Sequence, residues 1–205
     1  MKYILKNLEP QSFRDWKSGE NREYKNLLNP IKGDVKKSLL VEQGYICCYC
    51  ESKILKENSH IEHLKPKDKD KFPELQLDYD NMLCSCQKQL SKGEPRHCGN
   101  SKANDIIRIT PLDLNCESKF EYSEDGTIKA TDEDSEETKK YLKLDIPKLN
   151  ELRKNAIEPF IIDPITFEEV SEEEAKLFAK DYLKKKNGKY NEFYTTIKYL
   201  FLRDE

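Results

Sequence analysis

The sequence has no long hydrophobic run, and this excludes two classes of protein. Within its 205 residues, no apolar stretch approaches the roughly 20 residues that a transmembrane helix needs. The first six residues, Met1 to Lys6, also lack the apolar segment of a secretory signal. We therefore expect a cytoplasmic protein that makes no contact with a membrane.

A large excess of charge of one sign is also missing. The chain has 36 Lys and Arg against 39 Asp and Glu, a net charge of −3, although charged residues make up 37% of it. This balance argues against a broadly basic coat for nucleic acid, because such a coat needs a surplus of Lys and Arg. It leaves a local basic groove open.

Cysteine is absent before Cys47 and after Cys116, so the seven cysteines lie in one part of the chain. An odd number cannot all pair, and a reducing compartment disfavours structural disulfides. The clustering therefore indicates metal binding. The seven are Cys47, Cys48, Cys50, Cys84, Cys86, Cys98 and Cys116.

Cys47 and Cys50 have the Cys-x-x-Cys spacing of a zinc knuckle, which presents two thiolates from one tight turn. They follow a helix predicted over residues 27–43, with Gly44 placed to end it. A redox dithiol is the alternative, but it requires a βαβ pattern that this neighbourhood lacks. The remaining two ligands come from three candidates, Cys84, Cys86 and Cys98.

Two histidines and a carboxylate fall within four residues, His60-Ile61-Glu62-His63. When such groups converge they are metal ligands or acid–base groups, because a neutral imidazole is a good base near pH 7. Solvated histidines at the end of a strand are the alternative. The metal-type cysteines on both sides of the motif make that alternative less favourable.

The rest of the chain predicts a mixed architecture. Asp125-Gly126 predicts a hairpin over residues 119–130, and a capping box at Ser171 and Glu174 begins one of several helices with apolar stripes. The acidic residues 131–137 are expected to form a solvated turn. We divide the chain into an N-terminal arm and helix (1–44), a core (45–130) and a helical region for packing or a partner (131–205).

Three motifs occur in combination: Cys47-Cys48-Tyr49-Cys50-Glu51, Ile61-Glu62-His63-Leu64-Lys65-Pro66-Lys67 and His97-Cys98-Gly99-Asn100-Ser101-Lys102. Over roughly residues 40–130, the chain resembles the HNH (ββα-metal) endonucleases. It is most similar to the PtuB-type subunits of Septu and related retron anti-phage defence systems. The resemblance implies an α+β fold, with a zinc-stabilised, treble-clef-like ββα-metal core and helical N- and C-terminal extensions.

The resemblance also implies the ligands of two metals. Asn81-Met82 precedes Cys86 at the family's spacing, which favours Cys86 over Cys84. The implied structural zinc ligands are Cys47, Cys50, Cys86 and Cys98. The implied ligands of the catalytic magnesium or manganese ion are Glu62, Asn100, His60 and His97.

The remaining roles concern catalysis, substrate and partner. His63 is the implied general base, and Glu62 and Asn81 are the other catalytic residues. The implied contacts to the DNA backbone are Lys65, Lys67 and Lys102. The implied partner is an ATPase subunit of the PtuA type, which would make the protein part of a hetero-oligomer.

One departure from the family pattern favours a different function. The family places a His or Asn ligand directly after the last knuckle cysteine, where this chain has Gly99. The alternative function is therefore a catalytically inactive, zinc-stabilised module that binds nucleic acid or protein.

Overall fold

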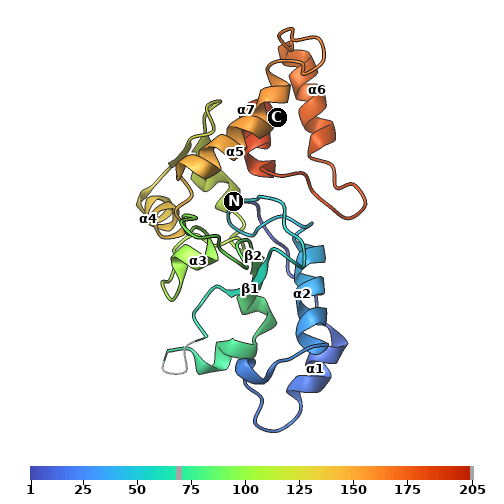
Figure 1. Cartoon of the computed structure of the whole chain (residues 1–205), viewed down its shortest axis with the longest axis vertical. Coiled ribbons are helices and arrows are strands. Elements are labelled where there is room, and N and C mark those ends of the chain that lie inside the picture. Colours follow the sequence, from blue (N-terminus) through green and yellow to red (C-terminus); the bar gives the residue numbers. More distant parts are fainter. Residues whose placement is uncertain (68–70, 204–205) are drawn as a thin grey trace.

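The computed structural model describes residues 1–67 and 71–203, which form short helices around two small sheets (Figure 1). The α-helices are α1 (Gln11–Lys17), α2 (Ile31–Glu42), α3 (Gly99–Lys102), α4 (Glu133–Leu142), α5 (Pro147–Ile157), α6 (Glu172–Tyr182) and α7 (Tyr194–Phe201). Short 3-10 helices lie at Tyr24–Asn26, Pro73–Leu77, Tyr79–Asn81, Cys116–Lys119 and Glu158–Phe160. The strands are β1 (His60–His63), β2 (Met82–Ser85), β3 (Phe120–Tyr122) and β4 (Ile128–Ala130). The mixture of helices and small sheets confirms the α+β class.

Strands β1 and β2 pair antiparallel, with Glu62 opposite Leu83 and His63 opposite Met82. Figure 1 shows this sheet near the middle of the molecule, with α2 on one side and α3 on the other. Successive side chains of a strand point to opposite faces. His60 and Glu62 therefore share one face of the sheet, and His63 lies on the other.

Helix α2 confirms the predicted helix but begins later than expected, at Ile31. Val35 and Leu39 are fully buried, as an amphipathic helix requires. Leu28 lies within the range predicted to be helical, but it precedes the helix and is 69% exposed. Gly44 adopts φ +64° directly after the helix, and this left-handed conformation explains a glycine at the helix end.

The predicted hairpin around Asp125-Gly126 is confirmed by the antiparallel pairing of β3 with β4. The prediction of a solvated turn over residues 131–137 is wrong, because α4 begins there at Glu133. Asp132 accepts a hydrogen bond from the Ser135 backbone N–H and forms a capping box with it. Acidic residues in a first helical turn also interact favourably with the helix dipole.

The C-terminal helices enclose a small second core of Ile157, Phe160, Ala179 and Ile197. The capping box of Ser171 and Glu174 is confirmed at the start of α6. That helix ends at Tyr182. The ring of Phe160 stacks on that of Phe201 with centroids 5.0 Å apart. Phe160 therefore belongs to this second core, and Phe201 packs against it.

Residues 1–10 of the N-terminal arm form neither helix nor strand, and Met1 and Ile4 pack in the main core. Instead, the backbone N–H of Ile4 donates to the carbonyl of Pro111. Helix α1, which the sequence did not predict, buries Phe13. Over the described ranges, no helix is long and apolar enough to cross a membrane.

The main core contains residues from all three expected regions, with Val35 from 1–44, Met82 from 45–130 and Leu149 from 131–205. A polar contact also joins the cysteine knuckle to the last helix. The buried carboxylate of Glu51 accepts hydrogen bonds from the backbone N–H of Thr195 at 2.7 Å and from its hydroxyl at 2.5 Å. Thr195 lies in the first turn of α7, where backbone N–H groups lack helical partners.

Candidate functional site

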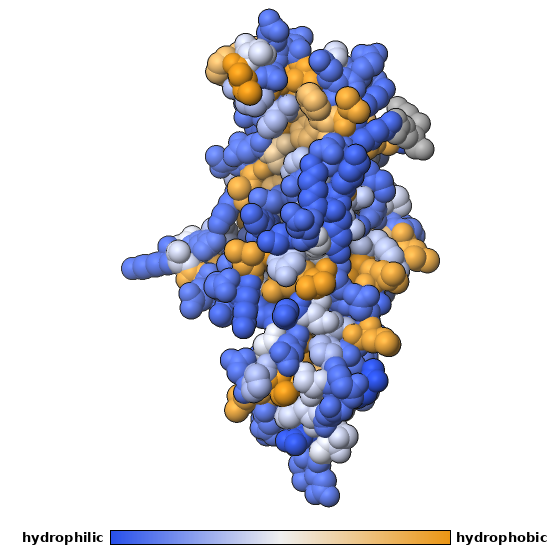
Figure 2. Space-filling view, turned by 90° about the vertical axis from the view of Figure 1, so that its right-hand side faces the viewer, coloured by the Kyte–Doolittle hydropathy of each residue, from blue (hydrophilic) through white to orange (hydrophobic). Residues whose placement is uncertain are grey.

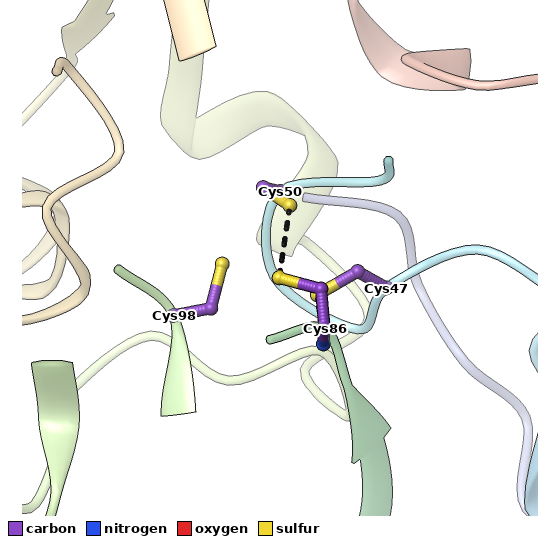
Figure 3. A group of neighbouring side chains, drawn as sticks. All are labelled: Cys47, Cys50, Cys86 and Cys98. Carbon is purple, nitrogen blue, oxygen red and sulfur yellow. Dashed lines mark hydrogen bonds between the residues drawn. The ribbon is translucent and has the colours of Figure 1, made fainter. Parts of the chain in front are cut away.

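Four buried cysteine side chains converge at one site (Figure 3), and one of them, Cys98, directly precedes α3. Their sulfur atoms all lie within 4.8 Å of one another, and the Sγ atoms of Cys50 and Cys86 are 3.8 Å apart. Cys47 and Cys50 come from the turn after α2, Cys86 follows β2, and Cys98 precedes α3. The structure thus brings together the four cysteines that the resemblance implied.

Burial and mutual hydrogen bonds shift the pKa values of these thiols in opposite directions. Burial alone would raise the pKa of Cys47, but hydrogen bonds from the surrounding thiols hold its pKa well below the usual value. Burial and the hydrogen bond with Cys47 raise the pKa of Cys98 well above it. Four buried thiolates need a cation to balance their charge, because an uncompensated buried charge is very costly. The set could therefore hold a metal that prefers four sulfur ligands.

The other cysteines lie outside the cluster. The thiol of Cys84 points to the backbone carbonyl of Lys36 at 3.8 Å, and that of Cys116 points to the carbonyl of Met1 at 3.4 Å. Cys48 is buried in the main core. Between the alternatives Cys84 and Cys86, the geometry favours Cys86.

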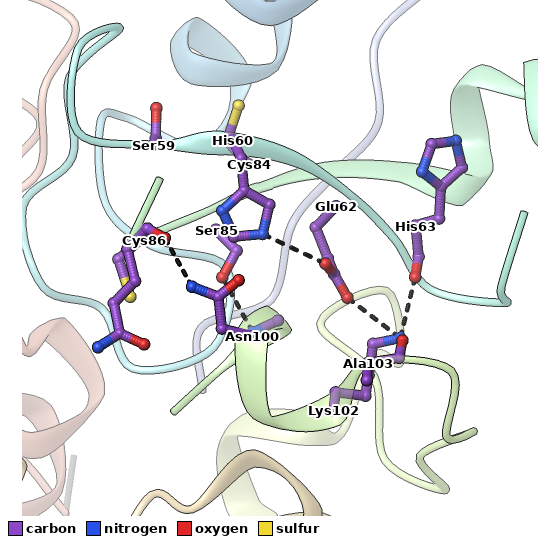
Figure 4. A network of polar contacts seen from close by, with 12 residues as sticks. Ser59, His60, Glu62, His63, Cys84, Ser85, Cys86, Asn100, Lys102 and Ala103 are labelled. Atoms are coloured by element: carbon purple, nitrogen blue, oxygen red, sulfur yellow. Dashed lines mark hydrogen bonds and ion pairs between the residues drawn. The ribbon is translucent and has the colours of Figure 1, made fainter. Parts of the chain in front are cut away.

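The carboxylate of Glu62 is the centre of a polar network on one face of β1 (Figure 4). It lies 3.5 Å from Nε2 of His60 and 3.1 Å from Nζ of Lys102, and it accepts a hydrogen bond from the Tyr49 hydroxyl at 3.3 Å. Burial favours the neutral acid, but the contacts with His60 and Lys102 outweigh it and lower the pKa of Glu62. Glu62 is therefore a buried carboxylate that is ionised at neutral pH.

Lys102 does not face the surface, where a DNA contact was expected. Its side chain is fully buried, and its ammonium group donates to the carbonyls of His63 at 3.0 Å and Leu64 at 3.3 Å as well as pairing with Glu62. The short helix α3 directs this side chain into the sheet. Lys65 and Lys67 are exposed, as a contact to substrate requires.

His63 lies on the opposite face of β1 from Glu62. Its Nε2 is 3.1 Å from the carbonyl of Gln76, and the ring of Tyr24 packs edge-on against it with centroids 4.5 Å apart. A carbonyl only accepts, so Nε2 carries the proton and Nδ1 is the basic nitrogen. Burial lowers the pKa of His63 to about 4, so the imidazole is neutral at pH 7.

The side chain of Asn81 forms hydrogen bonds with backbone groups near His63 and none with the His63 ring. Its amide donates to the carbonyls of Lys65 at 2.9 Å and Leu75 at 3.1 Å, and its oxygen accepts from the backbone N–H of Lys65. These bonds join the segment after β1 to the turn that presents the carbonyl of Gln76. Asn81 is thus placed to position His63 through the backbone.

His97 and Asn100 are two of the implied cation ligands. Their side chains contact groups other than Glu62. Nδ1 of His97 lies 3.2 Å from the sulfur of Cys98, beside the cysteine cluster. The amide of Asn100 donates to the carbonyl of Gln87 at 2.6 Å, and Figure 4 shows it near Ser85. Of the four residues proposed for the cation, the structure joins only His60 and Glu62 by a contact.

Gly99 stands where the family pattern has a His or Asn ligand. The surroundings of Gly99 explain why this position has no side chain. A β-carbon at residue 99 would lie 2.9 Å from Nε2 of His60 and even closer to Oε2 of Glu62. The space that a ligand at 99 would fill is therefore occupied by these two side chains.

The sequence did not predict the roles of Tyr24 and Gln76 beside His63. Tyr24 precedes α2, and Gln76 lies in the 3-10 helix before β2, so neither is near a recognised motif. Only the tertiary fold brings them to the imidazole, and no local signal in the sequence indicates either contact.

Comparison with known proteins supports the relationship inferred from the motifs. No protein-family model matches the chain. Over 99 residues, which are 48% of this chain, it is 34% identical to a protein of Vibrio cholerae serotype O1 biovar El Tor named "Retron Vc95 putative HNH endonuclease". The match covers 47% of that protein, so the chain spans about half the length of this relative. About half of the chain is therefore homologous to a protein that bears the HNH endonuclease name, which confirms the resemblance to the HNH endonuclease family.

Proposed function

We propose that this protein is a metal-dependent HNH endonuclease that hydrolyses phosphodiester bonds of DNA. The observation that carries the proposal is the placement of His60, Glu62 and His63 on β1, next to a buried cluster of four cysteines. Phosphodiester hydrolysis needs an acid–base group and cation-binding groups, and this short strand carries both kinds. The name of the Vibrio cholerae relative supports the same activity.

The proposed catalytic unit consists of β1, β2 and α3, in that order along the chain. The antiparallel pairing of the two strands and the position of the short helix after them support a ββα-metal unit. Zinc is the proposed ion of the four-cysteine cluster, because it favours tetrahedral thiolate sites. The proposed domain is residues 45–130, with 1–44 and 131–205 as its extensions.

Glu62 and His60 are the proposed protein ligands of a catalytic magnesium or manganese ion. Their side chains share one face of β1, and Gly99 leaves them room to meet. When bound, such an ion stabilises negative charge on the phosphate and on the leaving 3′ oxygen. The ionised state of the Glu62 carboxylate supports this role.

His63 is the proposed general base. Its neutral imidazole accepts the proton of the attacking water at Nδ1, while the carbonyl of Gln76 fixes the tautomer through Nε2. The water oxygen forms the new bond to phosphorus as the bond to the 3′ oxygen breaks. The products are a 5′-phosphate and a 3′-hydroxyl.

We further propose that the protein acts in anti-phage defence in the cytoplasm, as a PtuB-type subunit with a PtuA-type ATPase. The retron name of the relative supports this setting. Hydrophobic side chains remain exposed around the C-terminal helices, including Phe167 at 80% and Leu177 at 65%. Figure 2 shows orange side chains at the upper end of the molecule, and this end is the proposed docking surface.

A second candidate function is an inactive zinc-stabilised binding module. It is favoured by the contact between Lys102 and Glu62, because the carboxylate already has a buried cationic partner. Such a partner competes with a divalent ion for the same negative charge.

Nicking of supercoiled plasmid DNA by the purified chain distinguishes the two functions. We expect nicking that requires added magnesium or manganese, with zinc present in each molecule. The assay is repeated with the ATPase from the same locus, because the partner can be needed to present DNA. Bound zinc without nicking under either condition would favour the binding module.

A further inference from the structure

A lysine-rich cleft lies beside β1, between α2 and the segment that leads into the strand. Its volume is about 520 Å³. No aspartate or glutamate is among the described residues that line it. The lysines that line it are Lys32, Lys36, Lys56, Lys67 and Lys88, and we call it the lysine cleft.

The cationic groups of the lysine cleft are crowded. Partial burial and the charge of Lys32 lower the pKa of Lys67, and partial burial and the charge of Lys88 lower that of Lys36. Like charges that repel one another around an open cleft are stabilised by an anionic ligand.

Several of these side chains are held in place by the protein. The ammonium groups of Lys32 and Lys67 lie over the ring of Tyr24, at 5.1 and 4.5 Å from its centroid. The ammonium group of Lys36 donates to the backbone carbonyls of Lys56 and Ser59. Side chains that are already ordered lose less conformational entropy when they bind a ligand.

Two residues that line the lysine cleft contact the proposed catalytic side chains. His60 forms part of its wall and lies 3.5 Å from Glu62. Tyr24 forms another part and packs edge-on against His63. A chain of phosphates in the cleft would therefore pass His60 and Tyr24, the two residues that contact Glu62 and His63.

We propose that the lysine cleft binds the sugar-phosphate backbone of duplex DNA next to the bond that is cleaved. The inference rests on the proposed nuclease function and assigns Lys32, Lys56, Lys67 and Lys88 as contacts to backbone phosphates. Lys36 positions the wall of the cleft through its carbonyl contacts. A row of ammonium groups without carboxylates recognises phosphates regardless of base sequence.

The test compares two triple variants with the same change in net charge. The cleft variant is Lys32→Gln, Lys67→Gln and Lys88→Gln. The control is Lys129→Gln, Lys140→Gln and Lys154→Gln, at exposed positions on β4, α4 and α5. All proteins also carry His63→Ala so that cleavage does not disturb the measurement. Fluorescence anisotropy then gives the affinity for a short labelled duplex at several salt concentrations.

We expect the cleft variant to bind the duplex at least about tenfold more weakly at low salt than its His63→Ala parent. The slope of log affinity against log salt concentration should fall by roughly one unit for each lysine that contacts a phosphate. The control should retain the parent affinity and slope. The variant with Lys32→Arg, Lys67→Arg and Lys88→Arg, which preserves charge, should bind like the parent, while circular dichroism checks that every variant folds.

Three results would overturn the proposal. One is an unchanged affinity and salt slope in the cleft variant, and another is an equal loss of affinity in the control. The third is displacement of the duplex by inorganic phosphate added at the same concentration as the duplex. That result would assign the cleft to a small phosphorylated ligand.

The assay also separates this inference from the proposed function. If the wild-type chain nicks plasmid DNA but the cleft variant binds normally, the nuclease function stands and the inference fails. If the cleft lysines are needed for binding but the wild-type chain does not cleave, the inference stands and the nuclease function fails.

Discussion

Gly99 lies against the carboxylate of Glu62, so closely that a β-carbon at residue 99 would overlap its Oε2 atom. The HNH pattern places a ligand at this position, and here the neighbouring strand fills the same space with His60 and Glu62. This exchange explains why the proposed cation site has no side chain directly after the last knuckle cysteine. It also means that any larger residue at position 99 would displace Glu62 or His60.

Gly99→Ala should disturb the proposed cation site and leave the cysteine cluster intact. The added methyl group pushes on Glu62, and overpacking a well-packed interior costs about 1–3 kcal/mol. Because displacement of a reactive group by about 1 Å can cost 100-fold in rate, we expect a loss of nicking of at least about tenfold. Ser101→Ala on the same helix is the control. Wild-type nicking by Gly99→Ala would argue against Glu62 as a ligand.

His63→Ala should lower the rate of DNA cleavage by about 10²- to 10⁴-fold, the usual contribution of a general base. Zinc content and the far-UV circular dichroism spectrum should not change, because His63 lies on the face of β1 opposite Glu62 and is not one of the clustered cysteines. Glu74→Ala is a matched control on the 3-10 helix that contains Gln76. Unreduced nicking by purified His63→Ala would exclude this residue as the base.

Cys50→Ser should lose the bound zinc and the folded state, because a structural zinc site contributes directly to the free energy of folding. Metal analysis and thermal unfolding measure the two effects. Cys84→Ser is the control, since Cys84 is equally buried but lies outside the cluster. A soluble, zinc-loaded Cys50→Ser protein, or loss of zinc from Cys84→Ser, would contradict the assignment of the four ligands.

Lys102→Met should destabilise the protein by about 3–5 kcal/mol, because it leaves the buried carboxylate of Glu62 without its cationic partner. Urea unfolding measures this change. Adding Glu62→Gln should recover part of the lost stability, since the remaining group is then neutral. If the two substitutions destabilise additively, the ion pair does not stabilise the folded protein.

The sequence predicted best those features that depend on neighbouring residues. Gly44 ends a helix, Asp125-Gly126 turns a hairpin, and Ser171 begins α6, because each signal acts within a few residues. The prediction of a solvated turn at residues 131–137 is wrong, because the high charge of this segment does not distinguish a turn from a helix that begins after the capping residue Asp132.

In the site, too, short sequence motifs indicate some residues, whereas contacts between distant segments cannot be predicted from the sequence. Glu62 and His63 are proposed as site residues from motifs that are specific only in combination. Tyr24 and the burial of Lys102 could not be predicted, because they depend on how α3 and the segment before α2 pack against β1.

The hydrogen bonds between Glu51 and Thr195 have a consequence for any shortened form of this protein. Glu51 directly follows the second cysteine of the knuckle, and its carboxylate is buried under α7. A chain truncated before α7 would expose this carboxylate and open one side of the knuckle to water. A shortened form that preserves the proposed site must therefore retain the last helix, even though the motifs of that site lie far from it in the sequence.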